Sequence, residues 1–199
     1  MLAQAGPYSS GTGSLPFRSQ NPLTPALSRR EREWCSTGIM TWSLAIALLG
    51  AILLSAAGGL ATSIGPWYRN LRKPTWQPPD WLFGPAWTVI LGLTAWSASL
   101  AWDAAPSPDL SRKVVILFGV NALFHFAWSP LFFRLRRPDW ALYEVTFLWS
   151  SVLALVIGVA PLSVLAAWCV VPYLLWVTFA AWLNLAVVRL NGPFAPNLQ

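Results

Sequence analysis

Charged side chains are scarce in this sequence, and their scarcity argues against an ordinary water-soluble domain. Only 10% of the 199 residues are charged, whereas a soluble domain carries about 25%. Hydrophobic residues make up 56% of the chain, and the mean hydropathy is +0.53. This composition predicts an all-α integral membrane protein, because helices satisfy their own backbone hydrogen bonds in lipid.

Cysteine and histidine are also nearly absent. Cys35, Cys169 and the single His125 are not arranged at metal-ligand spacings, so we expect neither a disulfide framework nor a zinc site. The sequence shows no nucleophile with a base and no paired carboxylates. These absences make conventional hydrolysis or group transfer an unfavourable interpretation, and we expect no catalytic residue and no required cofactor.

Tryptophan, by contrast, is abundant, with 14 residues against two methionines. Such a number of large rings indicates that many of them line a common feature. The net charge of +6 comes from basic residues in short clusters between apolar runs, not along one helix face. We therefore expect no nucleic-acid partner, and we interpret the clusters as signals of membrane topology.

Five apolar runs are long enough to cross a bilayer, which takes about 20 residues of helix. The sequence therefore predicts a five-transmembrane-helix bundle within residues 40–191, followed by a C-terminal tail, 192–199. The expected helices cover residues 41–63, 82–102, 113–133, 140–160 and 163–188.

Residues 1–39 have a different composition, rich in Ser, Pro, Gly and Arg and without apolar periodicity. Such a segment cannot bury enough apolar surface to fold alone, so we expect it to be disordered. Because apolar sequence begins directly after Met40, we prefer a start at Met40 over a genuine extension beginning at Met1.

The basic residues are divided unequally between the two sides of five spans. From Met40 onward, one side holds Arg69, Arg72, Lys73, Arg134, Arg136, Arg137 and Arg189, and the other holds Arg112 and Lys113. Basic residues accumulate on the cytosolic side, so we expect the first loop and the C-terminus to face the cytosol. We expect a bacterial cell membrane, with the inner membrane as the physical default for helices.

The loop between the first two apolar runs is rich in proline and tryptophan. It reads Trp-Tyr-Arg-Asn-Leu-Arg-Lys-Pro-Thr-Trp-Gln-Pro-Pro-Asp-Trp-Leu-Phe-Gly-Pro-Ala-Trp over residues 67–87. Its prolines fix φ and remove backbone donors, so the loop should be stiff and cannot be one continuous helix. One interpretation of its indoles is an aromatic belt at headgroup depth.

This string resembles the first loop of the TspO/MBR family, that of the tryptophan-rich sensory proteins and translocator proteins. Ala127-Trp-Ser-Pro-Leu-Phe-Phe133 and Pro172-Tyr-Leu-Leu-Trp176 are similar to later family segments, as are Leu183-Asn184 and Arg189-Leu-Asn191. The resemblance runs from about residue 41 to residue 191. It implies a five-helix bundle, often a homodimer, that binds porphyrins in a pocket beneath the first loop.

Helical spacing brings candidate ligand-binding side chains to common faces. A flat tetrapyrrole would stack on aromatic rings, and its propionates would pair with loop cations. The expected pocket residues are Trp81, Phe83, Trp87, Asn121, His125, Trp128, Trp140, Glu144, Tyr173, Trp176 and Ala180. The expected loop-gating or propionate-binding residues are Arg69, Arg72, Lys73 and Trp76.

A purely structural interpretation stays open, in which these side chains only pack the helices together. His125 stands where the family commonly has Asn, and it would either ligate a metalloporphyrin or bond to a neighbouring helix. Glu144 lies inside a span, where a carboxyl is costly unless it is protonated or paired. The segment Leu183–Arg189 lacks the Tyr of the proposed sterol motif, so sterol binding is not inferred.

Three functions remain in competition. The first is a membrane receptor or regulator that binds porphyrin or haem-like tetrapyrroles, linked to their transport or sensing. The second is light-dependent porphyrin degradation, which needs only a bound pigment and nearby indoles. The third is a lipid-organising membrane protein without a small ligand. Beyond porphyrin, the partners we expect are membrane lipids and a second copy of the chain.

Overall fold

A computed structural model describes residues 41–194, and every regular element in that range is helical. The expectation of a disordered segment at residues 1–39 falls outside the described part, as does most of the predicted tail. The elements are α2 (Trp42–Ala61), α3 (Pro66–Asn70), α4 (Asp80–Ala104), α5 (Pro108–Ser129), a π-helical turn η1 (Pro130–Arg134), α6 (Pro138–Val159) and α7 (Val164–Asn191).

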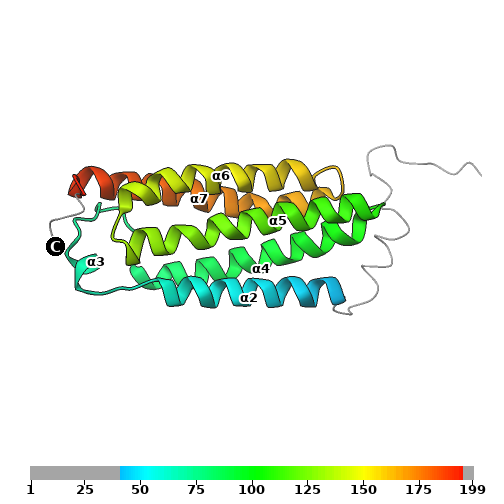
Figure 1. Cartoon of the computed structure of the whole chain (residues 1–199), viewed down its shortest axis with the longest axis horizontal. Coiled ribbons are helices and arrows are strands. Elements are labelled where there is room, and N and C mark those ends of the chain that lie inside the picture. The colour runs from blue at the N-terminus through cyan, green and yellow to red at the C-terminus, as the bar shows by residue number, and fades with distance from the viewer. Residues whose placement is uncertain (1–40, 195–199) are drawn as a thin grey trace, which may run out of the picture. The chain divides into compact units, whose positions relative to one another are not determined.

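The five long helices form one bundle, in which neighbours in space are not always neighbours in sequence (Figure 1). Helix α4 packs against α2 and α7, and α6 packs against α5 and α7. Helix α5 closes the arrangement through smaller contacts with α2 and α4. The main apolar core therefore lies between α4, α5, α6 and α7, where it includes Ile90, Val145, Leu148, Val152, Leu155, Val170, Tyr173 and Val177.

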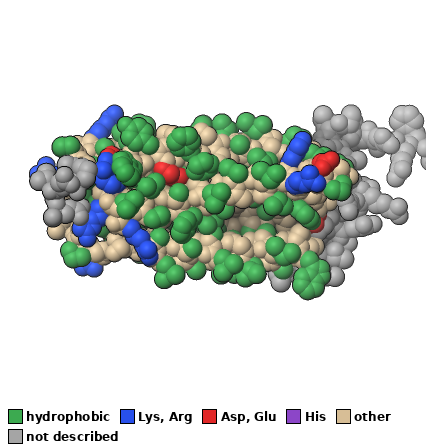
Figure 2. All heavy atoms as spheres, in the orientation of Figure 1, with side chains coloured by type: hydrophobic (Ala, Val, Ile, Leu, Met, Phe, Trp, Pro, Cys, Tyr) green, Lys and Arg blue, Asp and Glu red, His purple; other side chains and the backbone are tan. Residues whose placement is uncertain are grey.

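The surface of the bundle is apolar over most of its length. Figure 2 shows hydrophobic side chains along the visible face, while Lys and Arg gather at its ends, most of them at the end that carries α3. Helix α2 buries only Ala61 and exposes Trp42, Ile46 and Leu60. Since exposed apolar helices of this length are stable in lipid and not in water, the chain is a membrane protein.

Four of the described helical segments are long and apolar enough to cross a membrane: Trp42–Ala61, Pro108–Arg134, Pro138–Val159 and Val164–Asn191. The expectation of five spans is thus supported for four of them. Helix α4 has sufficient length, 25 residues, but it carries two Asp, four Trp and several Ser and Thr residues. These side chains lower its hydropathy, although four of its hydroxyl groups donate hydrogen bonds to a backbone carbonyl or to Asp103.

The start of α5 differs from the sequence expectation, because the helix begins at Pro108 and not at residue 113. Ser107 accepts a hydrogen bond from the Leu110 amide at 3.4 Å, which caps the helix. Proline is favoured at the first helical position, and Asp109 in the first turn suits the positive end of the helix dipole. The Pro-Ser-Pro-Asp stretch at residues 106–109, which lies between the expected helices 82–102 and 113–133, is therefore partly a helix start.

Pro130 changes the winding at the other end of this span. It has no amide hydrogen to donate, and the chain from Pro130 to Arg134 forms a π-turn in which the Leu135 amide donates to the Pro130 carbonyl at 2.9 Å. Arg136 then adopts a positive φ of 53°, which turns the chain toward α6.

A short polar seam joins the beginning of α2 to the end of α4. Ser43 donates to Asp103 at 2.8 Å and lies 2.8 Å from the Ser99 hydroxyl. Thr41 caps α2 and also lies within hydrogen-bonding distance of Ser43 and Ser99. Polar contacts of this kind fix two membrane helices at one relative height.

Candidate functional site

Five aromatic rings meet between α4, α5 and α7, and we refer to Phe83, Trp87, His125, Tyr173 and Trp176 as the Trp87 cluster. The Trp87 ring centroid lies 4.7 Å from His125, 5.8 Å from Tyr173 and 6.2 Å from Trp176, in each case edge to face. Phe83 meets Trp176 at 5.8 Å in the same manner. The structure thus brings together five of the expected pocket residues from three helices.

A hydrogen bond lies at the inner end of the Trp87 cluster. The His125 Nδ1 atom is 3.0 Å from the Tyr173 hydroxyl oxygen, and the Tyr173 side chain is completely buried. The bond joins α5 to α7 and gives His125 the neighbouring-helix partner that one interpretation of the sequence expected.

The Trp87 cluster continues outward to the first loop through Phe179. Its ring lies 5.6 Å from Trp176 and 5.9 Å from Trp76. Trp76 belongs to the proline-rich loop and is 45% exposed, so the series of rings connects the bundle interior to its surface. Phe179 was not among the residues predicted from the sequence, although its position three residues after Trp176 places both on one face of α7.

Four buried polar atoms near this region have no hydrogen-bond partner in the described residues. They are both carboxyl oxygens of Glu144 and the indole nitrogens of Trp128 and Trp176. Buried polar atoms are normally bonded, and leaving one unpaired costs about 1–3 kcal/mol. Indole donors and a carboxyl without partners are the arrangement expected where polar atoms are reserved for a ligand.

Other predicted pocket residues have partners within the bundle. Asn121 is buried and donates to the Ser151 hydroxyl at 2.9 Å. The Trp128 ring stacks on Phe132, with centroids 5.0 Å apart. Neither Ser151 nor Phe132 was predicted from the sequence as a partner, although Phe132 follows Trp128 by four residues.

Three further predicted residues lie outside the Trp87 cluster. Trp81 is 71% exposed, and Trp140 is 49% exposed with the Arg137 guanidinium 4.5 Å from its ring centroid. Ala180 is partly buried on α7. Neither indole makes a ring contact with the cluster among the described residues. Both lie in the first turn of a long helix, α4 or α6, which agrees with the interpretation of an aromatic belt.

The loop cations have protein partners near α3. Lys73 lies 3.6 Å from the centroid of the Tyr68 ring and 3.7 Å from an Asp80 carboxylate oxygen. Tyr68 donates to Asp80 at 2.9 Å, and Gln77 donates to the same carboxylate at 3.1 Å. Burial, and then the hydrogen bond and charge of Asp80, raise the pKa of the Tyr68 phenol well above its ordinary value. Lys73 is therefore engaged within the loop.

Asn191 fastens the loop to the end of α7. Its amide oxygen accepts from the Arg72 backbone amide at 2.7 Å, and its nitrogen donates to the Arg72 carbonyl at 2.8 Å. The nitrogen also donates to the Val187 carbonyl at 2.8 Å. Arg72 itself is exposed, and Arg69 makes a 3.5 Å hydrogen bond to the Ile64 carbonyl.

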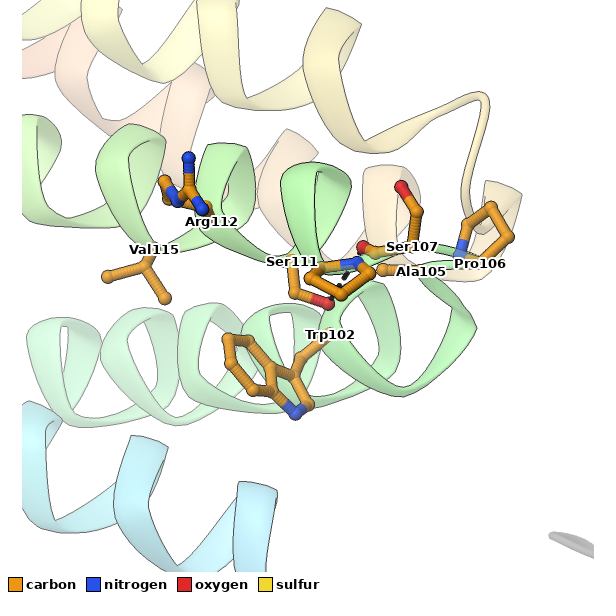
Figure 3. A pocket seen from close by; sticks show the side chains of 8 residues that line it. Trp102, Ala105, Pro106, Ser107, Ser111, Arg112 and Val115 are labelled. Carbon is orange, nitrogen blue, oxygen red and sulfur yellow. Dashed lines mark hydrogen bonds between the residues drawn. The ribbon is translucent and has the colours of Figure 1, made fainter.

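Two open grooves mark the surface of the bundle, and neither is the predicted aromatic pocket. One, of about 560 Å³, lies where α4 turns into α5 and includes Trp102, Ser107 and Arg112. Figure 3 shows Trp102 on one side and Ser111, Arg112 and Val115 on the α5 side. The other, of about 500 Å³, is lined by Pro74, Thr75, Trp76, Trp182, Leu185, Ala186, Arg189 and Leu190.

No group of three or more His, Cys, Asp or Glu side chains is placed to hold a metal ion in residues 41–194. His125 uses its Nδ1 atom toward Tyr173, which leaves only Nε2 for any other contact. Ligation of a metalloporphyrin by His125, the other of the two interpretations of this residue, stays a hypothesis.

Comparison with known proteins gives the family. The family profile described as TspO/MBR matches residues 43–190. The chain is 30% identical over 153 residues to the tryptophan-rich protein TspO of Chlorobaculum tepidum, covering 77% of this chain and 97% of that one. It is 34% identical over 152 residues to the tryptophan-rich sensory protein of Cereibacter sphaeroides, covering 76% and 94%. It is 32% identical over 128 residues to the human translocator protein, covering 63% and 75%. With the match extending from the first long helix to the last, the chain belongs to the TspO/MBR family.

Proposed function

We propose that this protein is a membrane receptor or regulator that binds porphyrins and similar flat apolar ligands at the Trp87 cluster. The observation that carries the proposal is the pairing of edge-on aromatic rings with unpartnered polar atoms. Trp176 belongs to both sets, because its ring contacts Phe83 and Trp87 while its indole nitrogen has no partner among the described residues. Aromatic walls with a few convergent polar groups are typical of small-molecule sites.

The chemistry of the ligand follows from the aromatic rings of the Trp87 cluster and from the arginines of the first loop. A tetrapyrrole presents a large aromatic face for the rings and carboxylates for cations. Arg72 and Arg69 lie exposed on the loop that carries Trp76, at the outer end of the ring series. The rings of the Trp87 cluster already contact one another. Binding therefore requires the Phe179 ring to separate from Trp76 and Trp176, which opens the cluster on the side of this loop.

The topology is part of the same proposal. Helix α4 supplies Phe83 and Trp87 and is long enough, at 25 residues, to be a fifth span beside the four apolar ones. With five spans, the first loop and the C-terminus lie on the same side of the membrane, and we propose that their arginines face the cytosol of a bacterial cell. A homodimer remains a prediction.

Dark titration of the purified full-length protein in detergent with protoporphyrin IX tests the proposal. We expect saturable quenching of tryptophan emission. Trp176→Phe keeps an aromatic ring but removes the unpartnered indole N–H, so it should weaken binding about tenfold, the equivalent of one good hydrogen bond. Trp168→Phe is the matched control on the same helix, because Trp168 is 65% exposed.

Equal binding by both variants would refute the site. Absence of saturable quenching in the unmodified protein would refute porphyrin as the ligand and favour the lipid-organising interpretation. Illumination of the bound complex, alongside a solution of free porphyrin, then tests degradation. An enzymatic activity requires the bound pigment to be lost faster than the free pigment.

A further inference from the structure

The contact between His125 and Tyr173 is suited to more than helix packing. The phenol oxygen and Nδ1 are 3.0 Å apart, within the range in which a proton moves directly between two atoms. In the tautomer that carries its hydrogen on Nε2, His125 accepts the phenolic proton at Nδ1. Tyr173 is completely buried, so its proton has no route to bulk water at this point.

Trp87 lies against both partners of this hydrogen bond. Its ring centroid is 4.7 Å from that of His125 and 5.8 Å from that of Tyr173. Trp176 follows at 6.2 Å, and Phe179 leads from there to the exposed Trp76. Indole and phenol are the side chains most readily oxidised by one electron in this region. Trp176, Trp87 and Tyr173 are in contact, and only the Phe179 ring separates them from the exposed indole of Trp76.

We propose that Tyr173 and His125 form a redox-active pair in which one-electron oxidation of Tyr173 is coupled to transfer of its phenolic proton to His125 Nδ1. An oxidised Trp87 takes one electron from Tyr173 and returns to the neutral indole. The Tyr173 O–H bond breaks as an N–H bond forms at His125 Nδ1. The products are a neutral tyrosyl radical and an imidazolium, so the positive charge of the oxidised indole ends on His125.

The identity of the molecule that oxidises Trp87 rests on the proposed porphyrin function. A photoexcited tetrapyrrole accepts one electron from Trp87 and passes it to dioxygen, which leaves the oxidised indole described above. The Tyr173–His125 pair then holds the oxidising equivalent at the inner end of the Trp87 cluster, one ring contact beyond Trp87. Any other one-electron oxidant that reaches Trp76 from solution would supply the same hole through the series of rings.

The oxidation of Tyr173 depends on the basic Nδ1 atom of His125. Without an acceptor, oxidation of the phenol would give a radical cation that still carries its proton. That species is much harder to form than the neutral radical that proton transfer to Nδ1 leaves. Asn in place of His125 has similar polarity but no basic nitrogen, so it cannot accept the proton. His125→Asn therefore separates redox coupling from simple helix–helix bonding.

The test is freeze-quench electron paramagnetic resonance on the full-length protein, with two sources of oxidant. In the first, photogenerated tris(bipyridine)ruthenium(III), with persulfate as the electron acceptor, oxidises the protein without porphyrin. In the second, the protein loaded with protoporphyrin IX is illuminated in air. The variants are Tyr173→Phe, His125→Asn and the control Tyr143→Phe, whose residue is 72% exposed on α6. Circular dichroism shows which variants remain folded.

We expect a tyrosyl radical in the unmodified protein and in Tyr143→Phe, its loss in Tyr173→Phe, and its replacement by a tryptophan radical in His125→Asn. If Tyr173→Phe fails to fold, His125→Asn decides the result alone. A tyrosyl signal that survives in folded Tyr173→Phe or His125→Asn overturns the pair, as does its absence from the unmodified protein with ruthenium. A signal with ruthenium but none with porphyrin supports the pair and contradicts the porphyrin oxidant.

Discussion

The hydrogen bonds of Asn191 should control how tightly the first loop is held to α7. Asn191→Ala removes the donor and the acceptor that engage the Arg72 backbone, at 2.8 and 2.7 Å. A net hydrogen bond contributes about 0.5–1.5 kcal/mol, and the exposed Arg72 backbone regains water when the loop opens. The two bonds therefore stabilise the closed loop by about 1–2 kcal/mol, so the variant should raise the opened population about 5- to 30-fold.

Hydrogen–deuterium exchange at the Arg72 amide measures that population directly, because exchange requires the bond to Asn191 to break. We expect Asn191→Ala to accelerate exchange at Arg72 by about the same 5- to 30-fold factor while amides in the middle of α7 stay protected. Asn191→Asp keeps the acceptor and loses the donor, so its exchange rate at Arg72 should lie between those of the unmodified protein and Asn191→Ala. Asn70→Ala, at an exposed position of α3, is the control. Unchanged exchange at Arg72 in Asn191→Ala would show that the loop is held by other contacts.

Three further predictions concern stability. Tyr68 keeps its proton in the folded protein above its ordinary pKa of 10.0, whereas the unfolded chain loses it, so thermal stability should fall as pH rises above 10, and less steeply in Tyr68→Phe. A Cβ at Gly158 would lie 2.6 Å from Leu117 Cδ1, so Gly158→Val should lower the free energy of unfolding in detergent by about 1–3 kcal/mol. Gly158→Ala should leave that free energy nearly unchanged, because the Leu117 side chain can change rotamer. Ser107→Ala removes the cap of α5 and should lower the same free energy of unfolding by about 1 kcal/mol. Ser150→Ala is the control and should leave it unchanged. A Tyr68→Phe pH profile identical to the unmodified one, an unaffected Gly158→Val, or a Ser107→Ala indistinguishable from its control would each contradict the corresponding argument.

The sequence predicted the long helices well because apolar runs bounded by Pro, Ser and Asp carry a strong local signal. The least accurate boundary was the start of α5, which was expected at residue 113, whereas Pro108 suits the first helical position and begins the helix. Helix α4 shows a different limit, that of predicting a membrane span from composition. Its length fits a span, but its polar residues face other groups, as when Ser97 donates to the Ala166 carbonyl at 2.8 Å, and composition alone cannot register that.

The candidate site was predictable only in part. Helical spacing placed Tyr173 and Trp176 close to one face, and the family resemblance pointed to Trp87, yet neither determined which helices would be neighbours. Trp140 illustrates the gap, since it shares a helical face with Glu144 but lies half exposed beneath Arg137. Periodicity shows which residues lie on one face, whereas the partner of that face depends on the packing of the whole bundle.

The shallow attachment of α2 has a consequence for how the protein is made. Only Ala61 of this helix is buried. Its hydrogen bonds to the rest of the bundle lie at its two ends, in the polar seam of Ser43, Ser99 and Asp103 and in the bond from Arg134 to the Leu60 carbonyl at 3.2 Å. A segment that needs lipid more than it needs neighbours can leave the translocation machinery and reside in the bilayer before the rest of the chain is synthesised. The seam then acts as a late docking point, so Ser43→Ala should slow the final assembly of the bundle without preventing insertion of α2.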